Sequence, residues 1–166
     1  MMSGADAGPA IEEPARFGGR AAEPVDRRLR EAASAYADTV RAEGLLREAQ
    51  ALDPQCLPVY FALYKFYFYK RRLADAESAA LSGLAAAASQ AGFSSDWTAL
   101  SPESARWAAV DGPQHFYLFS LKALAFIRLR LGRAGEARAL LDKLAELDPQ
   151  DSVGASVIRA LAGAAI

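Results

Sequence analysis

The chain has 166 residues, of which 52% are apolar, so it can form one domain with a substantial core but not two domains of ordinary size. Its 19 basic residues balance 20 acidic ones, which excludes a chain-wide attraction to nucleic acid or to an anionic membrane. Cys56 is the only cysteine and His115 the only histidine, which excludes an internal disulfide and a Cys/His zinc cluster. We therefore expect a cytoplasmic protein with no metal and no cofactor.

Residues 1–25 are rich in Ala, Gly and Pro and contain no continuous apolar run. Because few apolar side chains offset the entropy cost of ordering, we expect a disordered tail that lacks the apolar core of a secretory signal. Farther along, charged residues interrupt every apolar stretch before it reaches the roughly 20 residues of a membrane-spanning helix. We expect no membrane segment.

From Asp26 onward the composition is that of helices, because Ala, Leu, Glu, Gln and Arg dominate and Gly and Pro occupy few positions. The aromatic run that begins at Tyr60 fits a helix better than a strand, since its apolar side chains recur every three and four residues. We predict six helical segments, at residues 26–51 with a break near Asp38, 57–70, 74–89, 114–131, 134–147 and 152–161.

Several of these helices have end signals in the sequence. The Asp-Pro pairs at 53–54 and 148–149 should each end a helix, because proline moves the preceding residue out of the α region. Gly132 can take the left-handed conformation that closes a helix. Ser101 before Pro102 predicts a short extra helix that runs through Trp107.

The chain contains an internal repeat. Residues 45–55 and 140–150 share both leucines at their start and the Leu-Asp-Pro-Gln sequence at their end. Residues 72–76 also parallel residues 133–137, where each segment connects two predicted helices. One unit, an antiparallel helix pair, therefore occurs at least twice.

These pairs resemble the tetratricopeptide repeat family, whose unit is a helix pair with a Trp, Leu, Gly, Tyr, then Ala, Phe, then Pro signature. In the C-terminal unit the matching positions hold Leu121, Leu124, Ala125, Arg128, Ala137, Leu141 and Pro149. The central unit matches at Tyr60, Leu63, Tyr64, Tyr67, Ala76 and Ala80, with Ala88 in place of the proline, and the N-terminal unit at Ala42, Leu46, Ala49 and Pro54. The resemblance covers roughly three quarters of the chain and implies an all-α, right-handed solenoid of about 2.5 to 3 repeats.

The resemblance divides the helical domain, 26–166, into five parts. They are a degenerate first unit at 26–54, a central unit at 57–89, an insertion at 90–113, a C-terminal unit at 114–149 and a capping helix at 151–163. Because one helix pair cannot bury its apolar face alone, the pairs should stack, with Ala76 and Ala137 where helices cross closely. The capping helix would cover the last open face with Val153, Val157, Ile158 and Leu161.

In the tetratricopeptide family the first helices of the pairs line a concave groove. The resemblance places six residues there: Phe61, Lys65, Phe68, Phe119, Lys122 and Phe126. Such a groove suits an amphipathic or extended peptide of a partner protein. The same phenylalanines also suit core positions beneath a neighbouring helix. The Lys and Asn clamp with which some family members hold a C-terminal carboxylate is disfavoured, because the chain contains no asparagine.

Five other residues are candidates for accessory contacts. Trp97 and Trp107 lie in the insertion, where they are either contact hot spots or pegs that fix the loop to the body, and the length of the loop favours pegs. Arg71, Arg72 and Arg133 belong to basic clusters at helix ends. Those clusters either form a rim for an acidic partner or stabilise the helix dipoles without any ligand.

No catalytic residues are predicted, because no acid/base or metal constellation can be assembled around His115 or Cys56. We expect a non-catalytic adaptor, accessory factor or chaperone that binds a protein or peptide, and neither nucleic acid nor membrane. A structural homo-oligomer that packs through the groove or the insertion is the alternative. Short bacterial proteins of this shape also resemble type III secretion chaperones and repeat proteins of nitrogen-fixation gene neighbourhoods.

Overall fold

A computed structural model of the chain describes residues 21–164. Within this range the chain forms seven α-helices, one short 3-10 helix and no strand, so the predicted all-α class is confirmed. The helices are α1 (Glu23–Ser34), α2 (Thr39–Leu52), α3 (Leu57–Tyr69), α4 (Leu73–Ala91), η3 (Trp97–Ala99), α5 (Gly112–Arg130), α6 (Ala134–Leu147) and α7 (Ala155–Ala164).

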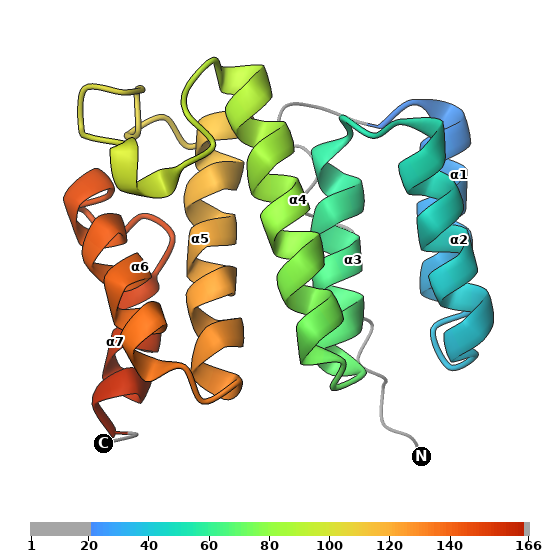
Figure 1. Ribbon diagram of the computed structural model, residues 1–166. Coiled ribbons are helices and arrows are strands. Elements are labelled where there is room, and N and C mark those ends of the chain that lie inside the picture. Colours follow the sequence, from blue (N-terminus) through green and yellow to red (C-terminus); the bar gives the residue numbers. More distant parts are fainter. Residues whose placement is uncertain (1–20, 165–166) are drawn as a thin grey trace.

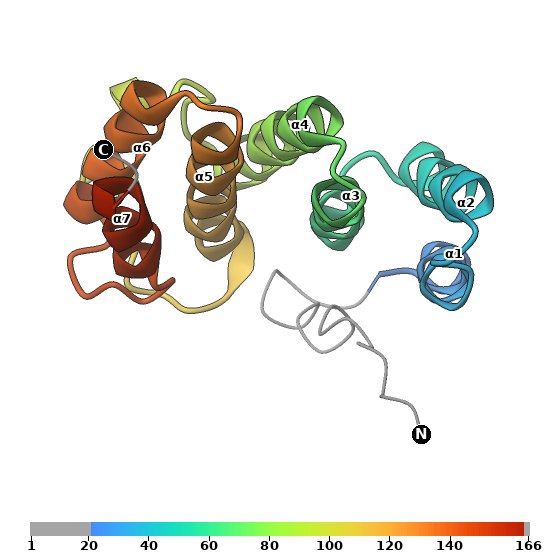
Figure 2. The same cartoon turned by 90° about the horizontal axis from the view of Figure 1, so that it is seen from below.

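Six of the helices form three antiparallel hairpins, α1 with α2, α3 with α4, and α5 with α6, which stand side by side in a row (Figure 1). Viewed along the helices, α1, α3, α5 and α7 lie on one side of the row and α2, α4 and α6 on the other (Figure 2). α5 packs on both α4 and α6, and α7 covers the last hairpin. The fold therefore presents one face made of first helices.

Most predicted helix ends are confirmed. α2 and α6 end immediately before the two Asp-Pro pairs, and Asp53 has an extended φ of −149°. The predicted break near Asp38 separates α1 from α2, where the Asp38 carboxylate accepts a hydrogen bond from the Arg41 amide at 3.1 Å. Gly132, after α5, has a φ of +82°. These local signals set the boundaries correctly because each acts through the backbone of its own residue.

The predicted tail, 1–25, is wrong at its C-terminal end, because α1 begins at Glu23. Pro24 fits the first helical turn, and the carboxylates of Glu23 and Asp26 lie near the positive end of the helix dipole. The prediction of disorder for residues 1–20 concerns positions outside the described residues.

The short helix predicted from Ser101 to Trp107 is wrong. The Ser101 carbonyl accepts hydrogen bonds from the Ser104 amide (3.0 Å) and the Trp107 indole (2.9 Å), which gives a turn. The Ser104 hydroxyl also accepts from the Ser101 amide (2.9 Å). The helix of the insertion is instead η3, where the Asp96 carboxylate caps the Thr98 amide at 3.0 Å.

The capping helix also differs from its prediction, since α7 begins at Ala155 and not at Ser152. The Asp148 carboxylate accepts from the amides of Ser152 (3.0 Å) and Val153 (3.2 Å) and holds them in a turn. Val153 and Ile158 are buried as predicted. The predicted burial of Val157 and Leu161 is wrong, because 63% and 46% of their surfaces remain exposed.

A close helix crossing lies at Gly83 of α4, which faces both α3 and α5. A Cβ atom at this position would lie 2.9 Å from Cβ of Tyr60 and 3.3 Å from the ring of Phe116. Ala76 and Ala137, the predicted crossing residues, are fully buried. Small residues on the second helices thus let the hairpins approach one another.

Candidate binding groove

All six residues predicted for the groove line a single groove between α3 and α5. Its volume is about 290 Å³. Five further residues complete the lining: Tyr64, Tyr69, Ala123, Ile127 and, from α7, Ile158. The groove lies on the face of the row that the first helices form.

Two pairs of phenylalanine rings form the floor of the groove. Phe61 on α3 contacts Phe119 on α5, with ring centroids 5.7 Å apart, and Phe68 contacts Phe126 at 5.1 Å. Within each helix the two rings are seven residues apart, which is about two turns or 10 Å along the axis. The sequence spacing therefore places both pairs on the same side of their helices.

The four phenylalanines differ in exposure. Phe61 is buried, with 6% of its surface exposed, whereas Phe68, Phe119 and Phe126 are half-buried and pack against the core from outside. Of the two interpretations given for these phenylalanines, the core position beneath a neighbouring helix therefore applies to Phe61. The other three rings keep part of their surface at the groove.

A lysine lies between the two rings of each helix. The ammonium group of Lys65 is 5.0 Å from the Phe61 ring and that of Lys122 is 4.6 Å from the Phe119 ring, both within cation–π range. Lys122 also donates a hydrogen bond to the Val153 carbonyl at 2.7 Å, which fixes it beside the loop before α7. The groove thus combines an apolar floor with two positive charges.

Among the described residues that line the groove there is no carboxylate and no histidine. The described part of the chain also contains no group of three or more His, Cys, Asp or Glu side chains placed to hold a metal ion. What the groove offers chemically is apolar surface, aromatic rings and two ammonium groups.

Sequence reasoning missed two features of the groove. Tyr64 lies in its lining, and its hydroxyl is 3.2 Å from the Ser120 hydroxyl on α5. The position of Tyr64 one turn after Phe61 and one turn before Phe68, two predicted groove residues, was a usable signal. Ile158 had no such signal, because the angle at which a terminal helix docks depends on contacts distant in sequence.

The chain is 34% identical over 129 residues to a protein of Azotobacter chroococcum mcd 1 described as an uncharacterized 19.8 kDa protein in the nifW 5′ region. The aligned part is 76% of this chain and 72% of that protein. The chain belongs to the same family. No family model and no solved structure matches the chain.

Of the accessory candidates in this family member, Arg72 holds two hairpins together. Its guanidinium binds both carboxylate oxygens of Glu43 on α2, at 2.7 and 3.0 Å, and the Tyr67 hydroxyl donates to the same carboxylate at 2.6 Å. The hydrogen bonds from Arg72 and Tyr67 lower the pKa of Glu43. Arg72 also pairs with Asp75 (2.9 Å).

Arg133 makes the corresponding contact at the next hairpin. It binds Glu77 on α4 at 2.7 Å, and Arg128 of α5 binds the same carboxylate at 2.8 Å. Arg71, in contrast, is exposed and has a positive φ of 62°. The sequence indicated the arginines but missed their partners, Glu43 and Glu77.

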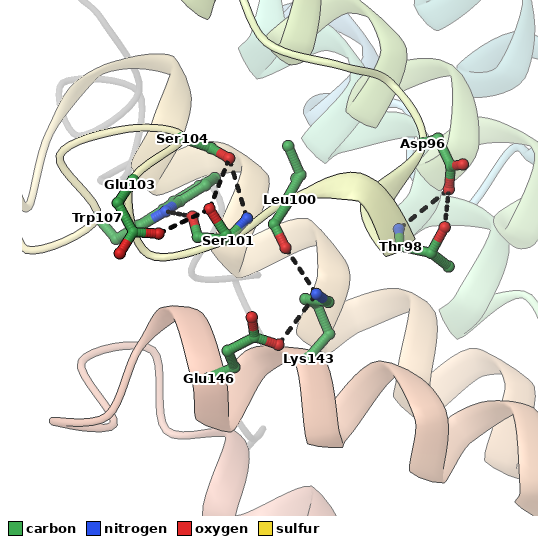
Figure 3. Close-up of polar contacts among 9 residues, drawn as sticks. All are labelled: Asp96, Thr98, Leu100, Ser101, Glu103, Ser104, Trp107, Lys143 and Glu146. Atoms are coloured by element: carbon green, nitrogen blue, oxygen red, sulfur yellow. Dashed lines mark hydrogen bonds and ion pairs between the residues drawn. The ribbon is translucent and has the colours of Figure 1, made fainter.

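The insertion is fixed to the last hairpin. Trp107 is buried, its ring centroid lies 5.1 Å from that of Phe93, and its indole N–H donates to the Ser101 carbonyl. Lys143 on α6 points toward the insertion and donates to the Leu100 carbonyl at 2.6 Å (Figure 3). Trp97 is half-buried against the core. Both tryptophans lie outside the groove, in positions that the peg interpretation predicts.

The single histidine and the single cysteine are both buried. Burial raises the pKa of the Cys56 thiol, which keeps it in the less reactive protonated form. No α-helix in the described part of the chain is both long enough and apolar enough to span a bilayer.

Proposed function

We propose that this chain is a non-catalytic, cytoplasmic protein-interaction module of the tetratricopeptide type, which binds a peptide or helix of a partner protein between α3 and α5. The observation that carries the proposal is the groove itself. Two phenylalanine pairs and two lysines, which the resemblance assigned to a groove, lie together in one.

Equivalent contacts in successive hairpins support the tetratricopeptide type. Glu43 and Glu77 make the same ion pairs with the following hairpin, and they lie 34 positions apart in the sequence. The tetratricopeptide unit has that same length. The turns after α3 and α5 also match, since the Tyr67 carbonyl accepts from the Arg72 amide (2.8 Å) and the Arg128 carbonyl from the Arg133 amide (2.9 Å).

The chemistry of the groove specifies the kind of ligand. Apolar side chains would cover the rings of Phe68, Phe119 and Phe126, and a carboxylate would meet Lys65 or Lys122. A volume of about 290 Å³ is at the lower limit for a small-molecule pocket, so it suits a few side chains of a peptide. We therefore propose a partner segment that carries spaced apolar residues and at least one acidic residue.

Affinity capture from a lysate of the source cell tests this function. The intact chain is compared with a Phe68→Ala, Phe126→Ala double variant, and a Val40→Ala, Leu81→Ala variant serves as control because both residues are exposed outside the groove. We expect one protein to be recovered by the intact chain and the control and lost with the groove variant. A segment of that protein should then bind the purified chain as a synthetic peptide. Equal recovery by all three chains would refute the proposal, provided that their melting temperatures agree.

A structural homo-oligomer is the second candidate, and one observation favours it. Val157 and Leu161 lie one turn apart on α7 and are 63% and 46% exposed at the end of the row of hairpins. A second copy could cover them. The molar mass measured by light scattering between low and high protein concentration decides this, because a constant monomer mass excludes self-association.

The relative from Azotobacter bears on the biological setting. Its printed name places it in the nifW 5′ region, which favours the nitrogen-fixation neighbourhood among the two settings that the sequence suggested. We propose an accessory role in that setting. Deletion of the gene should slow growth on dinitrogen and leave growth on ammonium unchanged, and equal growth of mutant and parent on dinitrogen would refute it. No corresponding observation favours the secretion-associated alternative.

A further inference from the structure

The spacing of the ring pairs selects the conformation of the ligand. The Phe61–Phe119 and Phe68–Phe126 pairs lie about 10 Å apart along α3 and α5, because the two rings of each helix are seven residues apart. In a ligand helix, residues seven positions apart also lie about 10 Å apart on one face. In an extended segment, side chains on one side recur about every 7 Å, so they lie about 7 or 14 Å apart and can match only one pair at a time. The spacing therefore favours a helix.

The groove also lacks the groups that an extended backbone needs. An extended segment leaves its N–H and C=O groups unpaired, and burying them without partners costs free energy. The described residues that line the groove include no side-chain amide and no carboxylate, and the Tyr64 hydroxyl already lies 3.2 Å from the Ser120 hydroxyl. A helix pairs its backbone groups internally and presents only side chains to the floor of the groove.

A third positive charge stands at one end of the groove. Arg130, in the last turn of α5, is exposed, and its guanidinium carbon lies 5.8 Å from the centre of the Phe68 ring. The two neighbouring arginines, Arg128 and Arg133, both bind Glu77. No carboxylate in the described part of the chain pairs with Arg130. Its charge is therefore available to a ligand that lies over Phe68.

Helix dipoles and this charge together favour one direction of the ligand. α3 and α5 run in the same direction (Figure 1), so both have their C-termini at the Arg130 end of the groove. A helix carries a partial negative charge at its C-terminus and a partial positive one at its N-terminus, so a ligand helix is favoured when its N-terminus lies at this end. Acidic side chains favour the first turn of a helix for the same reason. A ligand antiparallel to α3 and α5 thus brings an acidic first turn to Arg130.

We propose that the groove binds an amphipathic helix of the partner, which runs antiparallel to α3 and α5 and is selected by Arg130. Its first turn carries a carboxylate that pairs with Arg130, and two apolar residues, seven positions apart, cover the two ring pairs. The first of these follows the carboxylate by one turn and lies over Phe68 and Phe126. A second acidic residue, between the apolar ones, lies beside Lys65 and Lys122. This inference rests on the proposed function and adds the conformation, direction and charge pattern of the ligand.

Binding of designed peptides to the purified full chain tests this inference. The matched peptide is an acetylated, alanine- and glutamine-based helix with glutamates at its first and eighth positions and leucines at its fifth and twelfth. We expect fluorescence anisotropy to show saturable binding that Arg130→Ala weakens about twofold to fivefold, the effect of one exposed ion pair. Arg138→Ala is the control, because Arg138 is an exposed arginine of α6 outside the groove, and it should leave the Kd unchanged. The melting temperatures of both variants should equal that of the parent.

Three altered peptides separate the elements of the inference. With glutamine in place of the first glutamate, binding should weaken and should no longer respond to Arg130→Ala. With proline at the ninth position, affinity should fall about tenfold or more, because proline breaks the helix. With a nitroxide at the C-terminus of the matched peptide, the amide signals around Phe61 and Phe119 should lose more intensity than those around Phe68 and Phe126.

Four results would overturn the inference: no binding of the matched peptide, the same Kd for the Arg130 and Arg138 variants, equal affinity of the proline peptide, or a stronger effect of the C-terminal nitroxide at Phe68 and Phe126. The lysate capture reads out a separate property. A captured partner whose binding segment tolerates proline would keep the proposed function and exclude the helix. If the matched peptide binds as expected and no partner is captured, the groove still selects a helix and the proposed function fails.

Discussion

At the residue scale, Arg71 and Gly132 occupy equivalent turns and share an unusual backbone conformation. Their φ values are +62° and +82°, and each residue follows a first helix whose end it closes. This left-handed region disfavours a residue with a Cβ atom and is readily adopted by glycine. The turn after α3 is therefore less well matched to its sequence than the turn after α5.

We predict that Arg71→Gly stabilises the fold by up to about 1 kcal/mol, because it relieves the left-handed conformation at an exposed position. Gly132→Ala should destabilise it by about 1 kcal/mol for the converse reason. Chemical denaturation of the two variants measures both changes in the free energy of unfolding. A loss of stability in Arg71→Gly would show that the Arg71 side chain makes a contribution larger than the backbone effect.

The burial and the partners of single residues were predicted poorly where they depend on residues far apart in the sequence. The resemblance to the tetratricopeptide family assigned Phe68 and Phe126 to the groove, and both line the groove between α3 and α5. The burial of Phe61 was beyond the sequence, because it depends on the Phe119 ring, 58 residues away, and on the angle between two helices. The ion-pair partners of Arg72 and Arg133 were missed for the same reason, since both carboxylates belong to the preceding hairpin.

At the element scale, the contact of α4 with α3 and α5 depends on the absence of a side chain at Gly83. In an open helix, replacing glycine by alanine stabilises by about 0.5 to 1 kcal/mol. At Gly83 the new Cβ would lie 2.9 Å from Cβ of Tyr60, whose backbone is held within α3, so the helices must separate.

We predict that Gly83→Ala destabilises the fold by about 1 to 3 kcal/mol, the usual cost of overpacking. Gly44→Ala is the matched control, because Gly44 lies in the interior of α2 and its Cβ would meet nothing within 4 Å. This control should gain about 0.5 to 1 kcal/mol. Thermal unfolding followed by circular dichroism compares the two. Equal changes in both variants would mean that the hairpins are loosely packed at Gly83.

The contact between the first two hairpins should depend on pH. The lowered pKa of Glu43 means that its carboxylate favours the folded state at neutral pH, and this contribution is lost as the pH falls below the ordinary value of 4.5. Glu43→Gln should therefore lower the melting temperature at pH 7, and the difference from the parent should shrink as the pH falls below 4.5. Melting curves of both chains across this range measure the difference. A difference that stays the same size as the pH falls would assign the role of Glu43 to packing and not to charge.

Helix ends were predictable where the signal is local, and wrong where a neighbouring segment competes. The Asp-Pro pairs ended α2 and α6 as expected, since proline restricts the residue before it whatever the surroundings. The Ser101–Pro102 signal failed because the Trp107 indole and the Ser104 amide both use the Ser101 carbonyl. Side-chain hydrogen bonds of this kind compete with helix formation and cannot be ranked from spacing alone.

At the scale of the whole molecule, the hairpin order followed from the repeat, whereas the role of the insertion did not. The 20 residues between α4 and α5 contain no α-helix, and their sequence alone indicates a loop. In the structure it carries Phe93 and Trp107, which pack with the buried Tyr117 of α5, the Trp107 and Tyr117 ring centroids being 6.2 Å apart. The insertion therefore belongs to the core of the last hairpin.

This placement predicts a large effect from a residue that lies outside every helix. Trp107→Ala should destabilise the fold by about 3 to 5 kcal/mol, as expected when a buried tryptophan is truncated, and Trp97→Ala should cost less because Trp97 is only half-buried. Trp107→Phe retains the contact with Phe93 but loses the hydrogen bond to Ser101, so its stability should lie between those of the parent and Trp107→Ala. Urea denaturation of the three variants measures these differences. If Trp107→Ala unfolds at the same urea concentration as the parent, the insertion is a loop that merely covers α5, and the hairpins alone determine the stability of the chain.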